Sequence, residues 1–501
     1  MRYKRMKQKL SLLLAALILC TTFTACSTDT ADKTNETSTP NAGDNVTTTA
    51  ETDPAETRLY ADLPDVTFDG ETFKTAHWQY DTGVHMYDMD ADTQNGDLIN
   101  DAIYDRNVAV EEKYKVTITN EYQTLGTLTS NYKKMVQAGD HSWHAIFIRA
   151  YELPSQYNNG VLINLYALPH IDWTNPWWDQ DSVAGLSIIG VLPGVASDIN
   201  LADNGATACV MFNKNVANNA NINSDEFYQY VLDGSWTIDK MYEIGKLVSA
   251  DTDGNGEHNE GDLFGVLGQH DPTYMLFFGS GERYVNSDSE GVPQLVFDNE
   301  RSYAVCDKII NMMNDEVNYL ASSKIVDNFA ADKCLFMIDR LYRTESLRNM
   351  QSDYGVLPIP KYNEEQEEYY NIVSIHNSTL MTVPKTNPQL EMTGIILEAL
   401  ACESRYTVID TYYDVVLQEK LTRDAASYQM IEIIFNNRVF DIGELYKVGI
   451  FSEELLHMAA EKTAMTSKYK TFEKKMQKDL DKIVKQAEKM IEETEELELS
   501  M

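Results

Sequence analysis

The chain has 501 residues, of which 43% are hydrophobic, and it carries a formal net charge of −37. This length and apolar content suffice for one very large domain, or for two to three ordinary ones with hydrophobic cores. The acidity argues against nucleic-acid binding, because that affinity comes from lysine and arginine side chains that neutralise phosphates.

The first residues have the features of an export signal. Residues 2–9 contain five lysines and arginines, and residues 10–20 form an apolar run that is too short to remain as a membrane span. Residues 23–26, Phe-Thr-Ala-Cys, resemble a bacterial lipobox, in which small residues precede a cysteine that becomes acylated. We therefore predict a signal peptide over 1–25, lipidation at Cys26 and attachment to the outer face of the cell membrane. The alternative is an ordinary signal peptide with a stray cysteine.

Residues 26–57 are rich in threonine, asparagine, aspartate and alanine, so we predict a disordered tether there. Beyond it the chain becomes globular, and short buried strands alternate with amphipathic helices. The predicted strands are 73–78, 115–120, 143–149, 208–213 and 354–357, and the predicted helices are 97–114, 238–248, 301–316, 389–403 and 452–498. This mixture predicts an α/β fold.

An acidic loop after the predicted helix 238–248 has the spacing of a calcium-binding loop. The candidate ligands are Asp251, Asp253, Asn255, the backbone carbonyl of Glu257, Asn259 and Asp262, with Gly256 at the sharp turn. We predict a structural Ca²⁺ that connects the helix to a strand over 263–268. The last position holds Asp262 in place of a bidentate glutamate, and the following strand excludes a helix–loop–helix sensor. The alternative is a solvated turn rich in aspartate, glycine and asparagine.

No catalytic motif is evident, so we predict a protein that is not an enzyme. The glycines of Gly-Ser-Gly at 279–281 lack the strand–turn–helix context of a dinucleotide site, and we expect a turn there. The carboxylate separation that glycoside hydrolysis needs cannot be read from a sequence. Four further cysteines without a CxxC motif fit either disulfides of an exported protein or buried thiols. They are Cys209, Cys306, Cys334 and Cys402.

The chain contains 29 tyrosines and 6 tryptophans, and such rings can stack on sugar faces. We assign Trp177, Trp178 and Trp236 to the core. The better candidates for ligand contact lie just after predicted buried strands, where α/β proteins bind their ligands. They are Trp78, Tyr80, Arg149, Tyr151, Arg340 and Tyr342. In addition, Asp198 and Asp203 flank a loop before the strand 208–213 and could accept hydroxyl hydrogen bonds.

The lipobox, tether and α/β body together resemble an extracellular solute-binding lipoprotein of an ABC importer, of the carbohydrate-type family 1 that includes maltose-binding proteins. The resemblance covers residues 59–490. The segments that carry it are NGDLINDAIYDRN, AGDHSWHAIFIRAYELPSQYNNGVLINL, NPWWDQDSV, GSWTIDKMYEIGKLVSADTDGNGE, SDYGVLPIPKYNEEQEEYYN and YYDVVLQEKLTRDAASYQMIEIIFNNRVFD.

This resemblance implies a two-lobed, periplasmic-binding-protein-like (type II) α/β fold that closes on a ligand in a central cleft. The hinge crossings would fall near 196–205 and 371–380. The implied divisions are a first lobe over 58–200, a second lobe over 201–372, a return to the first lobe over 373–425, and C-terminal helices over 426–501 that pack mainly on the second lobe.

The resemblance also implies ligand contacts. Tyr342 matches a place where such proteins offer a stacking aromatic, although well-studied sugar binders have a tryptophan there. Arg149, Tyr151 and Glu152 match a place of polar and aromatic contacts, and the end of the early strand offers Trp78 and Tyr80.

The function that follows is a monomeric, lipid-anchored substrate-binding protein that delivers a carbohydrate, an oligosaccharide in particular, to the permease of an ABC importer. One alternative is a receptor for a peptide or another polar solute. A second is a surface protein that binds or hydrolyses glycans without transport. The sequence leaves open the ligand, the permease and the role of the acidic C-terminal helix.

Overall fold

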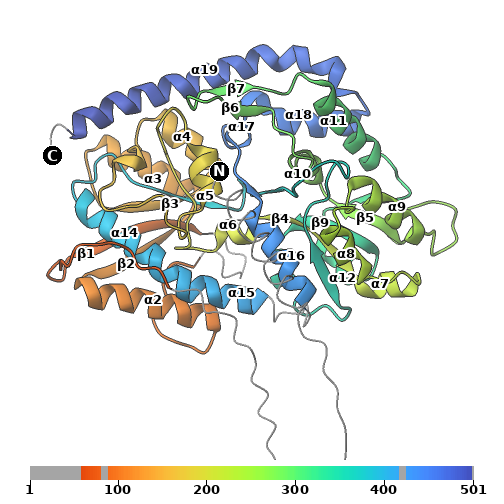
Figure 1. The fold of residues 1–501 in the computed structure, drawn as a ribbon, viewed down its shortest axis with the longest axis horizontal. Coiled ribbons are helices and arrows are strands. Elements are labelled where there is room, and N and C mark those ends of the chain that lie inside the picture. Colours follow the sequence, from red (N-terminus) through yellow and green to blue (C-terminus); the bar gives the residue numbers. More distant parts are fainter. Residues whose placement is uncertain (1–57, 80–87, 417–424, 499–501) are drawn as a thin grey trace, which may run out of the picture. The chain divides into compact units, whose positions relative to one another are not determined.

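The computed structural model describes residues 58–79, 88–416 and 425–498. Within them the chain is built around two separate sheets of four and five strands (Figure 1). The predicted signal peptide, Cys26, the tether over 26–57 and Tyr80 lie outside the described residues.

The first sheet has the strand order β12-β3-β1-β2. Its strands are β1 (Thr72–Gln79), β2 (Thr117–Thr124), β3 (Ala145–Arg149) and β12 (Thr379–Thr382). The inner strand β1 pairs in parallel with β2 and β3, whereas β12 runs antiparallel to β3 and places Thr379 opposite Arg149. Helix α3 (Leu125–Gln137) lies against β1, and α14 (Leu390–Ser404) lies against α2 (Leu98–Tyr114). We call this part the first lobe.

The second sheet has the order β10-β4-β9-β5-β8. Its strands are β4 (Ala208–Asn213), β5 (Phe264–Gly268), β8 (Tyr319–Ala321), β9 (Cys334–Arg340) and β10 (Tyr354–Leu357). Strand β4 is antiparallel to β9 and β10, and β5 is parallel to β8 and β9. Helix α9 (Ile238–Val248) lies against β5, and α16 (Ala425–Asn436) lies against β10. We call this part the second lobe.

Short elements connect and cover these sheets. The two-residue strands β11 (Asn371–Ile372) and β13 (Arg438–Val439) pair in parallel, and β6 (Val285–Ser287) and β7 (Pro293–Leu295) form an antiparallel hairpin. The other helices are α4 (Leu153–Asn158), α5 (Gln180–Leu186), α6 (Ala202–Gly205), α7 (Lys214–Asn219), α8 (Glu226–Leu232), α10 (Pro272–Gly279), α11 (Glu300–Met313), α12 (Ile325–Ala330), α13 (Arg343–Ser346), α15 (Asp410–Val416), α17 (Ile442–Leu445), α18 (Phe451–Glu461) and α19 (Met465–Glu498), and η6 (Val448–Ile450) is a 3₁₀ turn.

Helix α9 forms as its sequence predicts. The Thr237 hydroxyl accepts a hydrogen bond from the Lys240 backbone N–H at 3.1 Å, which caps the first turn. The predicted stripe of apolar residues is buried; it consists of Ile238, Met241, Ile244, Gly245 and Val248. A local cap and a single apolar face therefore suffice to define this helix.

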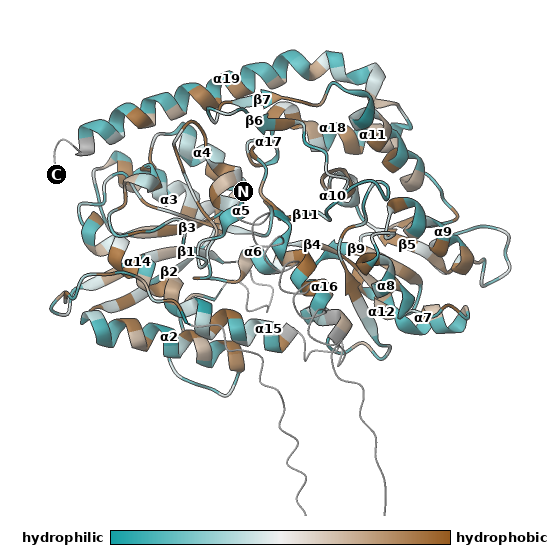
Figure 2. Cartoon of the chain, viewed as in Figure 1, coloured by the Kyte–Doolittle hydropathy of each residue, from teal (hydrophilic) through white to brown (hydrophobic). Residues whose placement is uncertain are grey.

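Helix α19 contacts both lobes. Its predicted apolar positions are all buried, namely Phe472, Met476, Leu480, Ile483, Ala487 and Met490. Near its start it lies against α11 and β7, and farther along it the Tyr157 hydroxyl of α4 donates to the Ile483 carbonyl at 2.8 Å. Lys385 then forms an ion pair with Glu493 at 2.6 Å. Figure 1 shows this path, and Figure 2 shows the alternation of apolar and polar residues along α19.

Two predicted core tryptophans and the four cysteines are buried in the structure. Trp177 and Trp178 are fully buried, and both indole N–H groups donate to the Glu398 carboxylate, at 3.1 and 2.7 Å. The four cysteines left open by the sequence are buried free thiols. Among the described residues, no helix combines the length and apolar character needed to cross a membrane.

Candidate functional site

Two adjacent crossover segments connect the two sheets. The first precedes β4 and the second precedes β12, and the Ser374 N–H of the second donates to the Ala206 carbonyl of the first at 3.0 Å. The end of β3 is bound to the second crossover, because the Tyr151 N–H donates to the Ile375 carbonyl at 2.9 Å. The end of β9 is bound to the first crossover in the same way. The Leu341 N–H donates to the Thr207 carbonyl at 3.0 Å, and the Tyr342 N–H donates to the Gly205 carbonyl at 2.9 Å. The carboxyl ends of β3 and β9 are thus held at one junction.

Side chains from three parts of the chain meet around Tyr151 at this junction. The Arg149 guanidinium lies 4.7 Å from the centre of the Tyr151 ring, and the His376 ring of the second crossover lies 4.8 Å from it. The Lys447 ammonium, from the turn between α17 and η6, lies 2.8 Å from the same ring centre. Arg149 and Tyr151 are half-buried, and His376 is exposed. Two cations and an imidazole therefore surround a single aromatic ring.

The second lobe contributes Arg340, the last residue of β9. Its guanidinium binds the Asp339 carboxylate at 3.1 Å, the Asp271 carboxylate, and the Tyr274 hydroxyl at 2.8 Å. Tyr274 also lies close to Ser374 of the second crossover. The Asp271 side chain is 39% exposed, so it keeps acceptor capacity toward solvent beyond its bond to Arg340.

The two groups of side chains share one electrostatic environment at His376. Its pKa is lowered, first because the surrounding protein displaces water, and then by the positive charges of Arg340, Arg149 and Lys447 against the negative charge of Asp271. We call Arg149, Tyr151, Asp271, Arg340, His376 and Lys447 the crossover cluster. Its neutral imidazole, carboxylate and guanidiniums can donate to and accept from a polar ligand.

The structure brings three of the predicted contact residues into this cluster, namely Arg149, Tyr151 and Arg340. Tyr342 lies beside it, half-buried, with the Arg343 guanidinium 4.8 Å from its ring centre. Trp78 is only 1% exposed, and its indole N–H donates to the Thr379 hydroxyl at the start of β12 at 2.9 Å. Trp78 therefore holds the second crossover against the first sheet in this structure.

Asp198 and Asp203 lie in a separate network of ion pairs. The Arg438 guanidinium binds Asp203 at 2.7 Å and also binds Asp179, and Arg405 lies 3.5 Å from Asp198. Burial, opposed by the nearby guanidiniums, raises the pKa of Asp198 to about 7 and that of Asp203 to about 6. Both carboxylates are thus already engaged by arginines of this chain.

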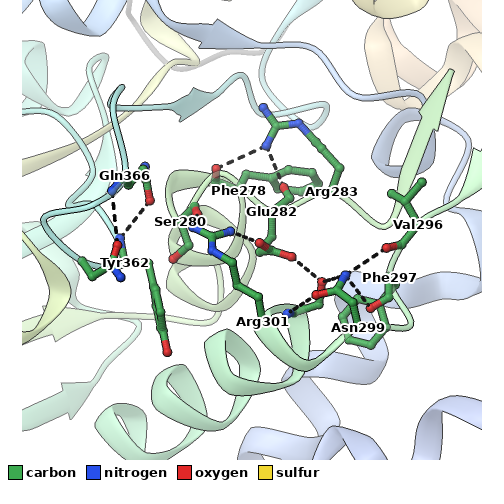
Figure 3. A network of polar contacts seen from close by, with 12 residues as sticks. Phe278, Ser280, Glu282, Arg283, Val296, Phe297, Asn299, Arg301, Tyr362 and Gln366 are labelled. Carbon is green, nitrogen blue, oxygen red and sulfur yellow. Dashed lines mark hydrogen bonds and ion pairs between the residues drawn. The ribbon is translucent and has the colours of Figure 1, made fainter. Parts of the chain in front are cut away.

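Arg438 also lines a cavity of about 350 Å³ whose walls come from α5, the β6 strand and the segment around β13. Arg283 lies in the same wall and donates to the carbonyls of Phe278 and Glu282, at 3.3 and 2.7 Å (Figure 3). The Glu282 carboxylate is itself bound by Arg301, which fixes the end of α10. The guanidiniums of Arg283 and Arg438 in this wall bind protein acceptors, and Arg438 Nε is buried without a partner among the described residues. We place the principal candidate site at the crossover cluster instead, because the carboxyl ends of β3 and β9 meet both crossovers there.

The predicted calcium loop brings three carboxylates together. One oxygen from each of Asp251, Asp253 and Asp262 lies within 4.8 Å of the others. Asp251 accepts backbone N–H bonds from Gly254 and Gly256 at 2.7 and 2.8 Å, and these bonds lower its pKa, led by the one from Gly256. The pKa of Asp262 is lowered as well, first by the hydrogen bond from the Asn259 N–H. The carboxylates of Asp251 and Asp262 are therefore ionised at neutral pH, and the loop's set of hard oxygens fits a divalent cation such as Ca²⁺.

The remaining predicted ligands of the loop take part in turns. The Asn255 side-chain oxygen accepts from the Glu257 N–H at 2.7 Å, and the Asn259 side-chain oxygen accepts from the Gly261 N–H at 2.9 Å. An amide oxygen has two lone pairs, so each retains one acceptor position for a cation.

Sequence reasoning missed Asp271, Tyr274, His376 and Lys447. Asp271 could have been found, because it comes shortly after the end of the buried strand β5, as Tyr151 comes shortly after the end of β3. His376 lies in an irregular crossover, and Lys447 lies at a turn between two short helical elements. Neither position carries a periodic signal, so the folded chain alone brings these two side chains to Tyr151.

The sequence matches no protein-family model and no curated protein, but the fold has solved relatives. An ABC substrate-binding protein of Listeria monocytogenes in complex with cycloalternan is 11% identical, with a TM-score of 0.53 over 83% of this chain and 99% of that one. The cyclic α-maltosyl-1,6-maltose binding protein of Arthrobacter globiformis is 11% identical, with a TM-score of 0.53 over 84% and 99%. UgpB of Mycobacterium tuberculosis, in complex with glycerophosphocholine, is 12% identical, with a TM-score of 0.53 over 76% and 95%. The predicted two-lobed α/β fold is confirmed.

Proposed function

We propose that this protein is the lipid-anchored substrate-binding protein of an ABC importer, which captures a carbohydrate between its lobes and passes it to the membrane permease. It performs no chemistry on the solute. In this proposal the lobes rotate about the two crossover segments and enclose the ligand, and the permease recognises the closed form.

One observation carries the proposal. Side chains from the end of β3, from the end of β9 and from the second crossover meet in the crossover cluster, so one solute can contact both lobes and the hinge at once. Aromatic faces beside a carboxylate–guanidinium pair suit sugars, because the rings stack on C–H faces while the charged groups bind hydroxyls. Tyr151 and Tyr342 would supply the faces, and Asp271 and Arg340 would supply the polar contacts.

The fold supports a binding protein. The similar protein of Listeria monocytogenes is in complex with cycloalternan, and that of Arthrobacter globiformis is a binding protein for cyclic α-maltosyl-1,6-maltose, which favours an oligosaccharide here. The similar UgpB is in complex with glycerophosphocholine, which keeps a peptide or another polar solute as the second candidate. A surface protein that holds or hydrolyses glycans is the third, and it would engage polymer without lobe closure or would form product.

A thermal-shift and calorimetric screen of the purified protein tests the proposal. Mono- and oligosaccharides, short peptides and polyamines are added one class at a time, and product formation is monitored. A ligand at a hundred times its dissociation constant stabilises the folded state by about 2.7 kcal/mol, which raises the melting temperature by a few degrees. A response to one sugar class without product supports the proposal, whereas a response to peptides alone would replace the carbohydrate by a peptide.

A matched pair of variants assigns the binding to the crossover cluster. Asp271→Ala removes the half-exposed carboxylate beside Arg340 and should weaken sugar binding at least tenfold. Asp239→Ala removes a carboxylate that pairs with Lys308 on the outer surface, at 2.6 Å, and should leave binding unchanged. Equal affinities for both variants would place the ligand elsewhere. Small-angle scattering should show compaction on ligand addition.

The anchor and the partner form part of the same proposal. Acylation at Cys26 would attach the protein to the outer face of the cell membrane, with residues 26–57 as the tether, and the permease subunits would be the partner. Cys26→Ser should move the protein from the membrane fraction to the medium or periplasm. We also propose that Ca²⁺ binds the loop over 251–262 and has a structural role between α9 and β5.

A further inference from the structure

Three carboxylates around the crossover cluster are already paired with arginines. Glu152 binds Arg149 at 2.8 Å. Asp339 binds Arg340 at 3.1 Å, and Asp271 binds the same guanidinium. These carboxylates are therefore engaged by guanidiniums and do not neutralise any further cation of the cluster.

Lys447 is the cation that remains. Among the described residues no carboxylate lies within ion-pair distance of its ammonium group, which instead lies 2.8 Å from the centre of the Tyr151 ring. Lys447 itself is half-buried. An ammonium group has three N–H donors, and a ring on one side leaves donors for a ligand on the other.

The backbone holds Lys447 firmly in this place. Its φ and ψ of 50° and 48° lie in the left-handed region, which a lysine adopts only when surrounding contacts fix it. The Lys447 N–H donates to the Glu444 carbonyl, and its own carbonyl accepts from the Ile450 N–H at 2.9 Å. A defined turn therefore places Lys447 beside Tyr151, and its ammonium group meets the ring.

The neighbouring arginines also have unused donors. The Nε atoms of Arg149 and Arg340 are buried and have no hydrogen-bond partner within the described part of the chain. An ammonium group without a carboxylate partner and two unused guanidinium N–H donors at one junction favour a ligand that carries a negatively charged acceptor.

We propose that the captured solute carries an anionic group, such as the carboxylate of an acidic sugar, and that Lys447 binds it in the crossover cluster. This inference rests on the proposed function and narrows its substrate class. A carboxylate and a sugar phosphate share this chemistry, and the experiment must separate them.

Calorimetry with a chemically matched pair of glycans tests the inference. The acid form is an oligogalacturonide, and the matched neutral form is the same oligomer with its carboxylates methyl-esterified. A second pair, a neutral disaccharide and its phosphate, separates the two anionic groups. The variants are Lys447→Met and Lys462→Met. Lys462 is a suitable control because it also has left-handed backbone, with φ 55°, but its ammonium pairs with exposed Glu316 at 3.4 Å.

We expect one acidic form to bind roughly tenfold or more tightly than its neutral partner, as a charge-assisted hydrogen bond provides. Lys447→Met should remove this preference and Lys462→Met should retain it, and the pair that shows the preference identifies the anion. If neutral glycans bind as tightly as acidic ones, or if Lys447→Met keeps the preference, the inference is wrong while the carbohydrate receptor stands. If no glycan of either kind binds, the proposed function fails as well.

Discussion

The Lys447 ammonium lies 2.8 Å from the centre of the Tyr151 ring, so a residue that follows β3 touches one in the turn between α17 and η6. The His376 ring packs on Tyr151 from the second crossover, 4.8 Å away. Tyr151 is therefore the side chain at which the first sheet, the crossover and the C-terminal segment meet. A ligand that contacts this ring is in reach of all three.

The ring of Tyr151, and not its hydroxyl, should determine ligand affinity. Tyr151→Leu removes the aromatic face that Lys447 and His376 pack against, and we expect ligand binding to weaken by about 1–2 kcal/mol, about five- to thirtyfold. Tyr151→Phe keeps the face and should bind within about twofold of the wild type. Calorimetric titration of both variants with the ligand found in the screen checks this, and a large loss with phenylalanine would assign the contact to the hydroxyl.

Calcium should stabilise the protein through the loop after α9. We expect addition of Ca²⁺ after chelation to raise the melting temperature of the wild type by a few degrees, because an ion that binds only the folded state stabilises it. Asp251→Ala combined with Asp253→Ala should abolish this rise. Differential scanning calorimetry with and without chelator measures it, and a wild type that does not respond after metal stripping would make the loop an ordinary turn.

A second aspartate separates metal binding from turn stability. Asp288 also accepts backbone N–H bonds in an exposed loop, from Glu290 and Val292 at 2.9 and 3.0 Å. It does not belong to the cluster of three carboxylates in the calcium loop. Asp288→Ala should lower the melting temperature slightly and keep the calcium response intact. Loss of the response in this variant as well would show that the effect is not specific to the loop over 251–262.

Local patterns predicted most elements closely, because their causes are local. The helical region predicted over 452–498 is divided into α18 and α19, because Lys462 has left-handed backbone that ends α18. Helix α9 begins and ends where its cap and apolar stripe indicate, and strands β4 and β10 have the predicted bounds. The pairing of β4 between β10 and β9 joins segments far apart in the chain. No pattern within a strand encodes that order, so it was predictable only through the resemblance to a family.

The candidate site was predictable where it follows buried strands and not elsewhere. Arg149 and Arg340 end β3 and β9, and the strand-end rule found both. The same rule named Trp78, but this residue lies within β1 and its indole N–H is bound by Thr379, so the ring is buried in the structure. His376 and Lys447 reach Tyr151 only through the path of the crossover and of the C-terminal segment.

The buried carboxyl of Glu444 should make stability depend on pH. Its hydrogen-bond donors are the hydroxyls of Ser452 and Tyr284, and burial raises its pKa from 4.5 to about 7. Between these values the folded protein holds more protons than the unfolded chain, so the free energy of unfolding falls as pH rises. The contribution of Glu444 to the free energy of unfolding is fully present below about pH 4.5 and is lost as pH rises through about 7. It amounts to at most about 3 kcal/mol.

The variant Glu444→Gln isolates this contribution. Glutamine keeps the shape of the side chain and cannot ionise. The free energy of unfolding of the variant should therefore rise relative to that of the wild type as pH rises from about 5 to about 8. Urea unfolding at both pH values measures the difference. Glu316, with a side chain 85% exposed, provides the control, and Glu316→Gln should follow the pH profile of the wild type. Parallel profiles for Glu444→Gln and the wild type would show that Glu444 is ionised in the folded state.

Two adjacent tyrosines should respond in opposite directions when their hydroxyls are removed. The rings of Tyr157 and Tyr446 pack edge to face, with centres 5.3 Å apart. The Tyr157 hydroxyl donates to the Ile483 carbonyl of α19 at 2.8 Å, whereas the Tyr446 hydroxyl is buried and has no hydrogen-bond partner among the described residues. Replacement by phenylalanine therefore removes a hydrogen-bonded hydroxyl at Tyr157 and, at Tyr446, a buried hydroxyl that has no partner among the described residues.

Tyr157→Phe should destabilise the protein by about 1 kcal/mol, because it removes a hydrogen bond that holds α19 to α4. It should also speed amide hydrogen exchange in α19 around Ile483. Tyr446→Phe removes a buried polar atom that lacks a partner, so it should leave stability unchanged or raise it by up to about 1 kcal/mol. Urea unfolding of the two variants and the wild type measures these changes in the free energy of unfolding. Equal losses would mean that packing of the rings, and not the bond to Ile483, attaches α19 to the first lobe.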